Sequence, residues 1–179
     1  MVGSTLIVGI GSPHGDDQLG WRLADQLADA LSRESLPREI EVRLARSPSK
    51  LSDWLAGVTR LIVCDACHGL GQPGDWRRFE WPTDDLALLK TTGSHDLSLP
   101  DVLRLADQLG RLPPDVVIWA IEAKEATPGQ PLSPEVATAI PRVVEQILVD
   151  CAAENRGSPA SAVAGRRTTN GALLSRSGG

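Results

Sequence analysis

Apolar residues gather in five short stretches of the chain, and each stretch predicts a β-strand. Residues 6–10 and 58–64 contain aliphatic runs, as expected for strands that are covered on both faces. Residues 40–45 and 75–81 instead alternate between apolar and charged side chains, which is the period of a half-exposed strand. The fifth predicted strand, residues 115–121, is apolar after its first residue.

Four helices are predicted between and after these strands. Leucines at positions 19, 23, 27 and 31 form one stripe with polar residues between them, which is the pattern of an amphipathic helix. Ser98 is a suitable N-cap for a helix that ends before Gly110, and Ser49 is a suitable N-cap for a shorter one. The predicted helices span residues 21–31, 49–55, 99–109 and 136–148.

The alternation of strands and helices predicts an α/β fold. We expect a three-layer α/β/α sandwich with a mostly parallel twisted sheet of about five strands. Residues 75–81 follow the preceding strand through a Gly/Pro loop without a helix, so this strand is expected to be the antiparallel one. A chain of 179 residues suits one domain, which we place at residues 1–154. Residues 155–179 are rich in Gly, Ser and Arg, and a disordered tail is predicted there.

Charge is distributed unevenly between the domain and the tail. The tail holds four arginines and no acid, which leaves 14 basic and 23 acidic residues, a net charge of −9, in residues 1–154. An acidic domain argues against nucleic acid as a partner, because phosphate binding needs a basic face. No apolar run reaches the roughly 18 residues of a membrane span, and no signal segment is recognisable. The odd number of cysteines favours the cytoplasm, where thiols stay reduced.

Three polar residues stand where predicted strands give way to loops, and they are the candidate functional residues. Asp17 follows the first strand and its glycine loop, Asp65 follows the strand at 58–64, and His95 precedes the helix at 99–109. The carboxyl ends of parallel strands line the ligand crevice of such folds, so these side chains can converge there. Two carboxylates and one imidazole form a ligand set for a divalent metal with open coordination positions.

Two segments of the chain resemble familiar motifs, a dinucleotide-binding loop and a haem attachment site, and we reject both interpretations. The loop at residues 9–20 lacks the third glycine of the dinucleotide fingerprint, because His14 occupies that position, and it carries two adjacent acids where a pyrophosphate would bind. The acid pair also has a simpler explanation as ordinary acids at a helix N-terminus. Residues 64–68, Cys-Asp-Ala-Cys-His, match the haem attachment pattern, but they end a buried strand, so we interpret Cys64 as a small buried hydrophobic residue.

Three stretches of the chain resemble the hydrogenase maturation proteases, the endopeptidases that trim the C-terminal extension from the nickel-containing large subunit of nickel–iron hydrogenases. Together these stretches cover most of residues 5–150. They are the glycine and acid loop at 7–20, the strand end at 61–66 with the Pro73-Gly74 that follows it, and residues 93–99 with the strand at 117–122 and Leu132-Ser133-Pro134.

The resemblance implies that Asp17, Asp65 and His95 are both the nickel ligands and the catalytic residues. It also implies that nickel arrives bound to the hydrogenase large-subunit precursor, so that a precursor without nickel is not cut. The protein is then a metal-dependent endopeptidase, and we expect a cytoplasmic monomer. Whether His95 is a ligand or a general base stays open. So do two alternatives: a nickel-reading chaperone that binds the same precursor without cutting it, and a small metal-assisted α/β hydrolase.

Overall fold

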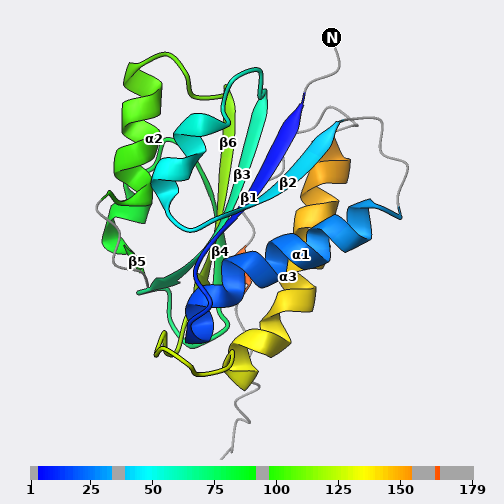
Figure 1. Cartoon of the computed structure of the whole chain (residues 1–179), viewed down its shortest axis with the longest axis vertical. Helices are drawn as coiled ribbons and strands as arrows, with labels where there is room; N and C mark the ends of the chain where they lie inside the picture. Colours follow the sequence, from blue (N-terminus) through cyan, green and yellow to red (C-terminus); the bar gives the residue numbers. More distant parts are fainter. Residues whose placement is uncertain (1–3, 34–38, 92–96, 155–163, 166–179) are drawn as a thin grey trace, which may run out of the picture.

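A mixed sheet separates two helical layers in the computed structural model, which describes residues 4–33, 39–91, 97–154 and 164–165 (Figure 1). The predicted α/β sandwich is confirmed. The five longer strands lie in the order β2-β1-β3-β6-β4. Their bounds are β1 Thr5–Ile10, β2 Ile40–Ala45, β3 Arg60–His68, β4 Trp76–Glu80 and β6 Asp115–Glu122.

Four of the longer strands run parallel, and the prediction of one antiparallel strand is confirmed for β4. Strands β2, β1, β3 and β6 pair in parallel, whereas β4 pairs with β6 antiparallel. Two strands of two residues each extend this sheet. Lys90–Thr91 (β5) pairs with the end of β3, and Ala164–Gly165 (β7) pairs with β4. The remainder of the predicted tail lies outside the described residues.

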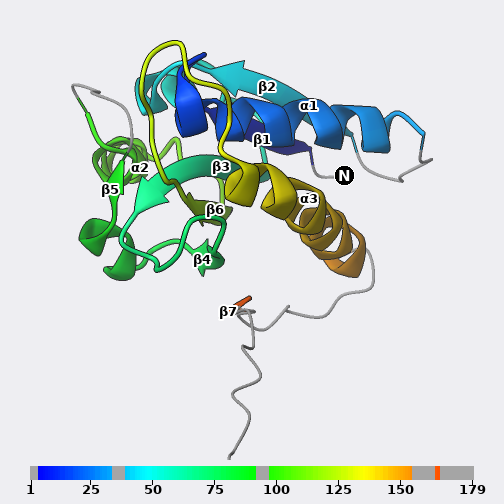
Figure 2. The same cartoon turned by 90° about the horizontal axis from the view of Figure 1, so that it is seen from below.

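Helices cover both faces of the sheet, and each face has its own apolar core (Figure 2). Helices α1, Leu19–Leu31, and α3, Pro134–Glu154, lie on one face, where the leucine stripe of α1 packs against the sheet. Helix α2, Leu99–Gln108, lies on the other face with the 3₁₀ helix η2, Pro48–Asp53. Among the described helices, none combines the length and the apolar character that crossing a bilayer requires.

The two predicted serine caps have different outcomes. The Ser98 hydroxyl accepts a hydrogen bond from the Asp101 N–H at 3.3 Å, so Ser98 is the N-cap of α2 as predicted. The prediction of a helix at 49–55 capped by Ser49 was wrong in type and start. Residues 48–53 form a 3₁₀ helix in which Ser47 holds the cap position without a side-chain cap bond. The Ser47 and Ser49 hydroxyls bond each other instead, 2.8 Å apart.

Strand β3 continues beyond its neighbour β1, and this corrects the predicted position of Asp65. The β1–β3 ladder stops at Gly9 and Cys64, but the β3–β6 ladder runs on to Cys67 and Glu122. Asp65 therefore lies inside a strand rather than at the start of a loop. From β1 the chain leaves through α1 on one face, and from β3 it reaches β6 through α2 on the other. A divergence of this kind opens the ligand crevice of α/β sheets.

Candidate functional site

The glycine loop holds Asp17 against the end of β1. Asp17 belongs to a single 3₁₀ turn, η1 (Gly15–Gln18), which leads into α1. A Cβ atom on Gly11 would lie 2.1 Å from the Asp17 carbonyl oxygen, so only glycine allows the loop to close this tightly. The same carbonyl accepts the Ser12 N–H at 3.2 Å. As a result, Asp17 is 4% exposed although it lies in a turn.

Asp17 and Asp65, two of the three predicted residues, are brought together. Asp65 projects from β3 and is 7% exposed. Burial raises its pKa well above the usual value of 3.8, and the negative charge of Asp17 raises it further. A hydrogen bond with the Ala66 backbone works in the opposite direction and lowers it. The two carboxylates therefore form a buried like-charge pair at the divergence of β1 and β3.

His95, the third predicted residue, lies outside the described residues, which stop at Thr91 and resume at Leu97. Within the described part of the chain, no group of three or more His, Cys, Asp and Glu side chains is arranged to hold a metal ion. The described residues nearest to this segment on either side include Lys90 and Ser98, and both line a cavity that Asp65 also lines. The three-residue metal site stays a prediction.

This cavity opens on the α2 face of the sheet and has a volume of about 410 Å³. Its floor is formed by Asp65, Cys67, Ile118 and Ala120 of β3 and β6. The remaining wall comes from the first turns of α2 and from the segment around the 3₁₀ helix η3, Asp85–Leu88. The volume lies in the range of small-ligand pockets.

Asp16, the neighbour of Asp17, has a structural role that its sequence position does not reveal. Its side chain is fully buried and does not cap α1. The carboxylate instead accepts hydrogen bonds from the backbone N–H groups of Lys124 and Glu125, at 2.8 and 3.1 Å. It also accepts two from Ser133, from its N–H at 2.7 Å and from its hydroxyl at 2.8 Å. Asp16 thus fastens the turn that carries Asp17 to the loop between β6 and α3.

Glu122 anchors a second loop at the same edge of the sheet. It is the last residue of β6, and one carboxylate oxygen accepts the backbone N–H groups of Gly69, Leu70 and Gly71 at 2.9, 2.6 and 3.3 Å. Its other oxygen lies 3.6 Å from Nδ1 of His68. Glu122 therefore fixes the start of the β3–β4 loop, and it is a second residue whose role sequence reasoning missed.

The cysteines of the haem-like pattern lie within β3 and face opposite sides of the sheet. Cys64 packs in the core under α1 and α3, whereas Cys67 packs in the core under α2. Burial is the largest cause that raises the pKa of both thiols. The interpretation of Cys64 as a small buried hydrophobic residue is confirmed, because its exposed area is zero.

A family model described as hydrogenase maturation protease matches residues 46–150 of the chain. Among solved structures, an endopeptidase from Escherichia coli in solution is similar, with a TM-score of 0.68, 23% identity and coverage of 90% of this chain and 97% of that one. The hydrogenase maturating endopeptidase HybD from E. coli gives a TM-score of 0.65 and 24% identity over 86% and 94%.

A third solved structure, the nickel–iron hydrogenase maturation protease HybD from Thermococcus kodakarensis, gives a TM-score of 0.62 and 23% identity over 82% of this chain and 97% of that one. At these identities the solved structures establish the fold. A comparison with curated protein sequences finds no match.

Proposed function

The chain belongs to the hydrogenase maturation protease family, and from this premise we propose that it removes the C-terminal extension of a nickel-loaded hydrogenase large-subunit precursor. In this proposal the nickel ion is carried by the precursor and is part of the substrate. Asp17, Asp65 and His95 bind it and serve the cleavage.

The observation that carries the proposal is the buried pair of Asp17 and Asp65. Two like charges held out of water are unfavourable, which is why the pKa of Asp65 is raised. A divalent cation offsets both charges at once, and carboxylate oxygens together with an imidazole nitrogen suit nickel. We infer that a precursor-bound nickel ion binds between the two carboxylates and displaces the proton that Asp65 holds when its pKa is raised.

Recognition and chemistry then depend on the same ion. Three protein ligands leave coordination positions free, so the ion can stay attached to the precursor while this protein binds it. A nickel ion so placed polarises a neighbouring carbonyl or lowers the pKa of a bound water. A precursor without nickel has no metal ion for the two carboxylates to bind, and it is not cleaved.

Cleavage of a precursor tests this proposal directly. The large-subunit precursor from the same organism is mixed with the protein, with and without nickel, and its mass is followed over time. We expect loss of a C-terminal peptide only with nickel, and no loss with Asp17→Asn, Asp65→Asn or His95→Gln. Asp25→Asn, an exposed position on α1, is the matched control and should cut normally. Normal cleavage by all three site variants would reject the assignment.

The same experiment separates the two alternatives. Nickel-dependent binding without a change in precursor mass identifies a chaperone. Hydrolysis of generic peptides or esters, with the precursor left intact, identifies a small hydrolase.

We further propose that the protein acts as a monomer in the cytoplasm. All three cysteines are buried thiols, which suits a reducing compartment. Sedimentation at 19.1 kDa would establish the monomer.

A further inference from the structure

Arg46 stacks on an aromatic ring at the carboxyl end of an edge strand. It directly follows Ala45, the last residue of β2, and its side chain is exposed. The guanidinium carbon lies 5.7 Å from the centre of the Trp21 ring, which belongs to the first turn of α1. A guanidinium that stacks on an aromatic ring keeps its N–H edge free for a carboxylate.

Trp21 is itself held in place beside the turn that carries Asp17. Its Nε1–H donates to the Ala45 carbonyl at 2.8 Å, and the same carbonyl accepts the Gly11 N–H at 3.0 Å. A Cβ atom on Gly11 would lie 3.6 Å from Cδ1 of the Trp21 ring and 2.1 Å from the Asp17 carbonyl oxygen. A single aromatic ring therefore separates Arg46 from the loop that holds Asp17.

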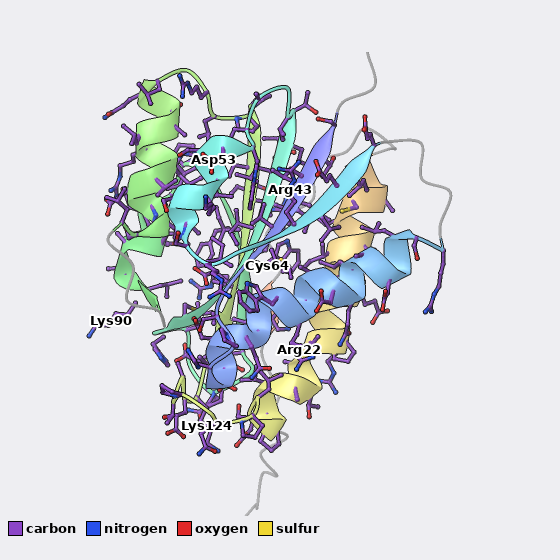
Figure 3. All side chains as sticks on the ribbon, in the orientation of Figure 1. Arg22, Arg43, Asp53, Cys64, Lys90 and Lys124 are labelled. Atoms are coloured by element: carbon purple, nitrogen blue, oxygen red, sulfur yellow. The ribbon has the colours of Figure 1, made fainter. Side chains whose placement is uncertain are left out.

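Two other arginines on the same two elements have acceptors within the protein, Arg43 on β2 and Arg22 on α1 (Figure 3). Arg43 also lies over a tryptophan ring, at 5.0 Å, but it pairs with Glu41 at 2.6 Å. Arg22 donates twice to Oε1 of Gln18, at 3.2 and 3.1 Å. Within the described part of the chain, the Arg46 side chain makes no hydrogen bond or ion pair, so its charge and its donors are available to a partner.

The charge of the surrounding domain limits what Arg46 can attract. Residues 1–154 carry a net charge of −9, and the buried pair of Asp17 and Asp65 adds negative charge at the same edge of the sheet. The domain as a whole therefore repels long acidic segments. One stacked arginine in this setting favours a single acidic position, and it disfavours a basic side chain there.

We propose that Arg46, positioned by Trp21, binds the side-chain carboxylate of one Asp or Glu residue of the precursor near its nickel-bound segment. The inference rests on the proposed function and adds a substrate-binding residue to it. The planar fork of arginine can hold a carboxylate through two parallel hydrogen bonds, which orients the bound segment as well as attracting it. Stacking on Trp21 reduces the conformational freedom that Arg46 loses when the carboxylate binds.

A charge exchange between the protein and its substrate tests this pairing. Arg46→Glu should lower kcat/KM for the nickel-loaded precursor by about 10- to 100-fold, because a charge-assisted hydrogen bond is replaced by repulsion. Arg46→Lys keeps the charge but not the planar fork, and it should give an intermediate rate. The Asp and Glu residues of the precursor around the cut and in its extension are then changed to Lys one at a time. At one position, Lys should slow the wild type and restore much of the rate with Arg46→Glu.

Arg111→Glu is the matched control for the charge change. Arg111 is exposed and lies between α2 and the start of β6, whereas Asp17 follows the end of β1. Because β1, β3 and β6 run in parallel, these positions belong to opposite edges of the sheet. Arg111→Glu should therefore cut like the wild type. Both arginines are exposed, so the urea unfolding midpoints of the two variants should agree with that of the wild type.

The outcomes distinguish this inference from the proposed function. If the wild type cuts the precursor and Arg46→Glu cuts equally fast, the pairing is rejected and the proposed function stands. Slow cleavage by Arg46→Glu that no Lys exchange restores rejects a side-chain partner. Equally slow cleavage of a precursor amidated at its C-terminus would then assign the terminal carboxylate instead. If the wild type does not cut the nickel-loaded precursor, the proposed function fails, and the affinities of the same variants for that precursor still test the pairing.

Discussion

Ser133 donates both its backbone N–H and its hydroxyl to the carboxylate of Asp16, although 117 residues separate the two in the sequence. The first bond is 2.7 Å and the second 2.8 Å long. Ser133 directly precedes α3, and Asp16 directly precedes Asp17. The hydrogen bonds therefore tie the start of α3 to the turn that carries one of the two paired carboxylates.

Asp16→Asn should lower the free energy of unfolding and also impair cleavage. An amide that replaces the buried carboxylate turns an acceptor into a donor facing other donors, and we expect a loss of about 3 kcal/mol. Urea denaturation measures it, with Asp25→Asn as the exposed control, which should change stability by no more than about 0.5 kcal/mol. A similar small change with Asp16→Asn would show that the bonds to the 124–133 loop contribute little.

Asp65→Asn should make the protein more stable at neutral pH while abolishing cleavage. The raised pKa of Asp65 means that the folded state binds its proton more tightly than the unfolded state does. This contribution to stability is fully present below the usual value of 3.8 and is lost as the pH rises through the folded-state pKa. Asn keeps the shape of the side chain and removes its charge, so the unfavourable burial of a carboxylate is lost together with the proposed metal ligand.

The measurement is urea unfolding of the wild type and Asp65→Asn between pH 3.5 and 8, in steps small enough to follow titration. The difference in unfolding free energy should shift progressively in favour of the variant as the pH rises. Asp29→Asn, at an exposed position of α1, should show no such trend. A pH-independent difference would mean that Asp65 titrates normally and that its proximity to Asp17 has no energetic effect.

The sequence predicts local features of this fold well because they depend on near neighbours. The leucine stripe of α1 and the Ser98 cap of α2 involve residues three or four positions apart, and both are confirmed. The β3 boundary was misjudged because its last residues pair with β5 and β6, which no local pattern reveals. The Asp16–Ser133 contact was missed for the same reason. Asp65 lies close enough to Asp17 for the two charges to interact, as predicted, although its predicted strand end was incorrect, and its role in the site stays a prediction.

Asp150→Ala should destabilise the fold strongly through a buried ionic cluster at the opposite end of the sheet. One oxygen of Asp150 in α3 accepts hydrogen bonds from Arg60 at 2.9 Å and Arg78 at 3.2 Å, and all three side chains are buried. Removal of the carboxylate leaves two guanidinium groups without this counter-charge, and we expect a loss of about 3–5 kcal/mol.

The control for Asp150→Ala is Asp53→Ala, which breaks the exposed pair of Asp53 and Lys50. Exposed pairs contribute at most about 1 kcal/mol, so this variant should unfold almost like the wild type. Thermal or urea unfolding compares the two variants. Equal effects of Asp150→Ala and Asp53→Ala would contradict the expected cost of removing a buried counter-charge.

The thiols should be inert in the folded protein. Burial raises the pKa of Cys64 and Cys67, so the reactive thiolate form is scarce, and Cys151 is buried as well. With a bulky disulfide reagent at pH 8, we expect no rapid reaction before unfolding and three reacting thiols in urea. An added exposed cysteine, Ala28→Cys, should react at once and calibrates the assay. Rapid labelling of the wild type would contradict the buried positions.

Because β3 extends past β1, Asp65 belongs to a central strand, whereas Asp17 belongs to a turn. A side chain on a paired inner strand cannot be moved by lengthening or trimming nearby loops. The position of the Asp65 carboxylate is therefore fixed by the sheet. Changes in the glycine turn can alter only the position of the Asp17 carboxylate. In the proposed nickel site, variation in metal preference among proteins built this way should accordingly trace to the first loop rather than to the middle of the sheet.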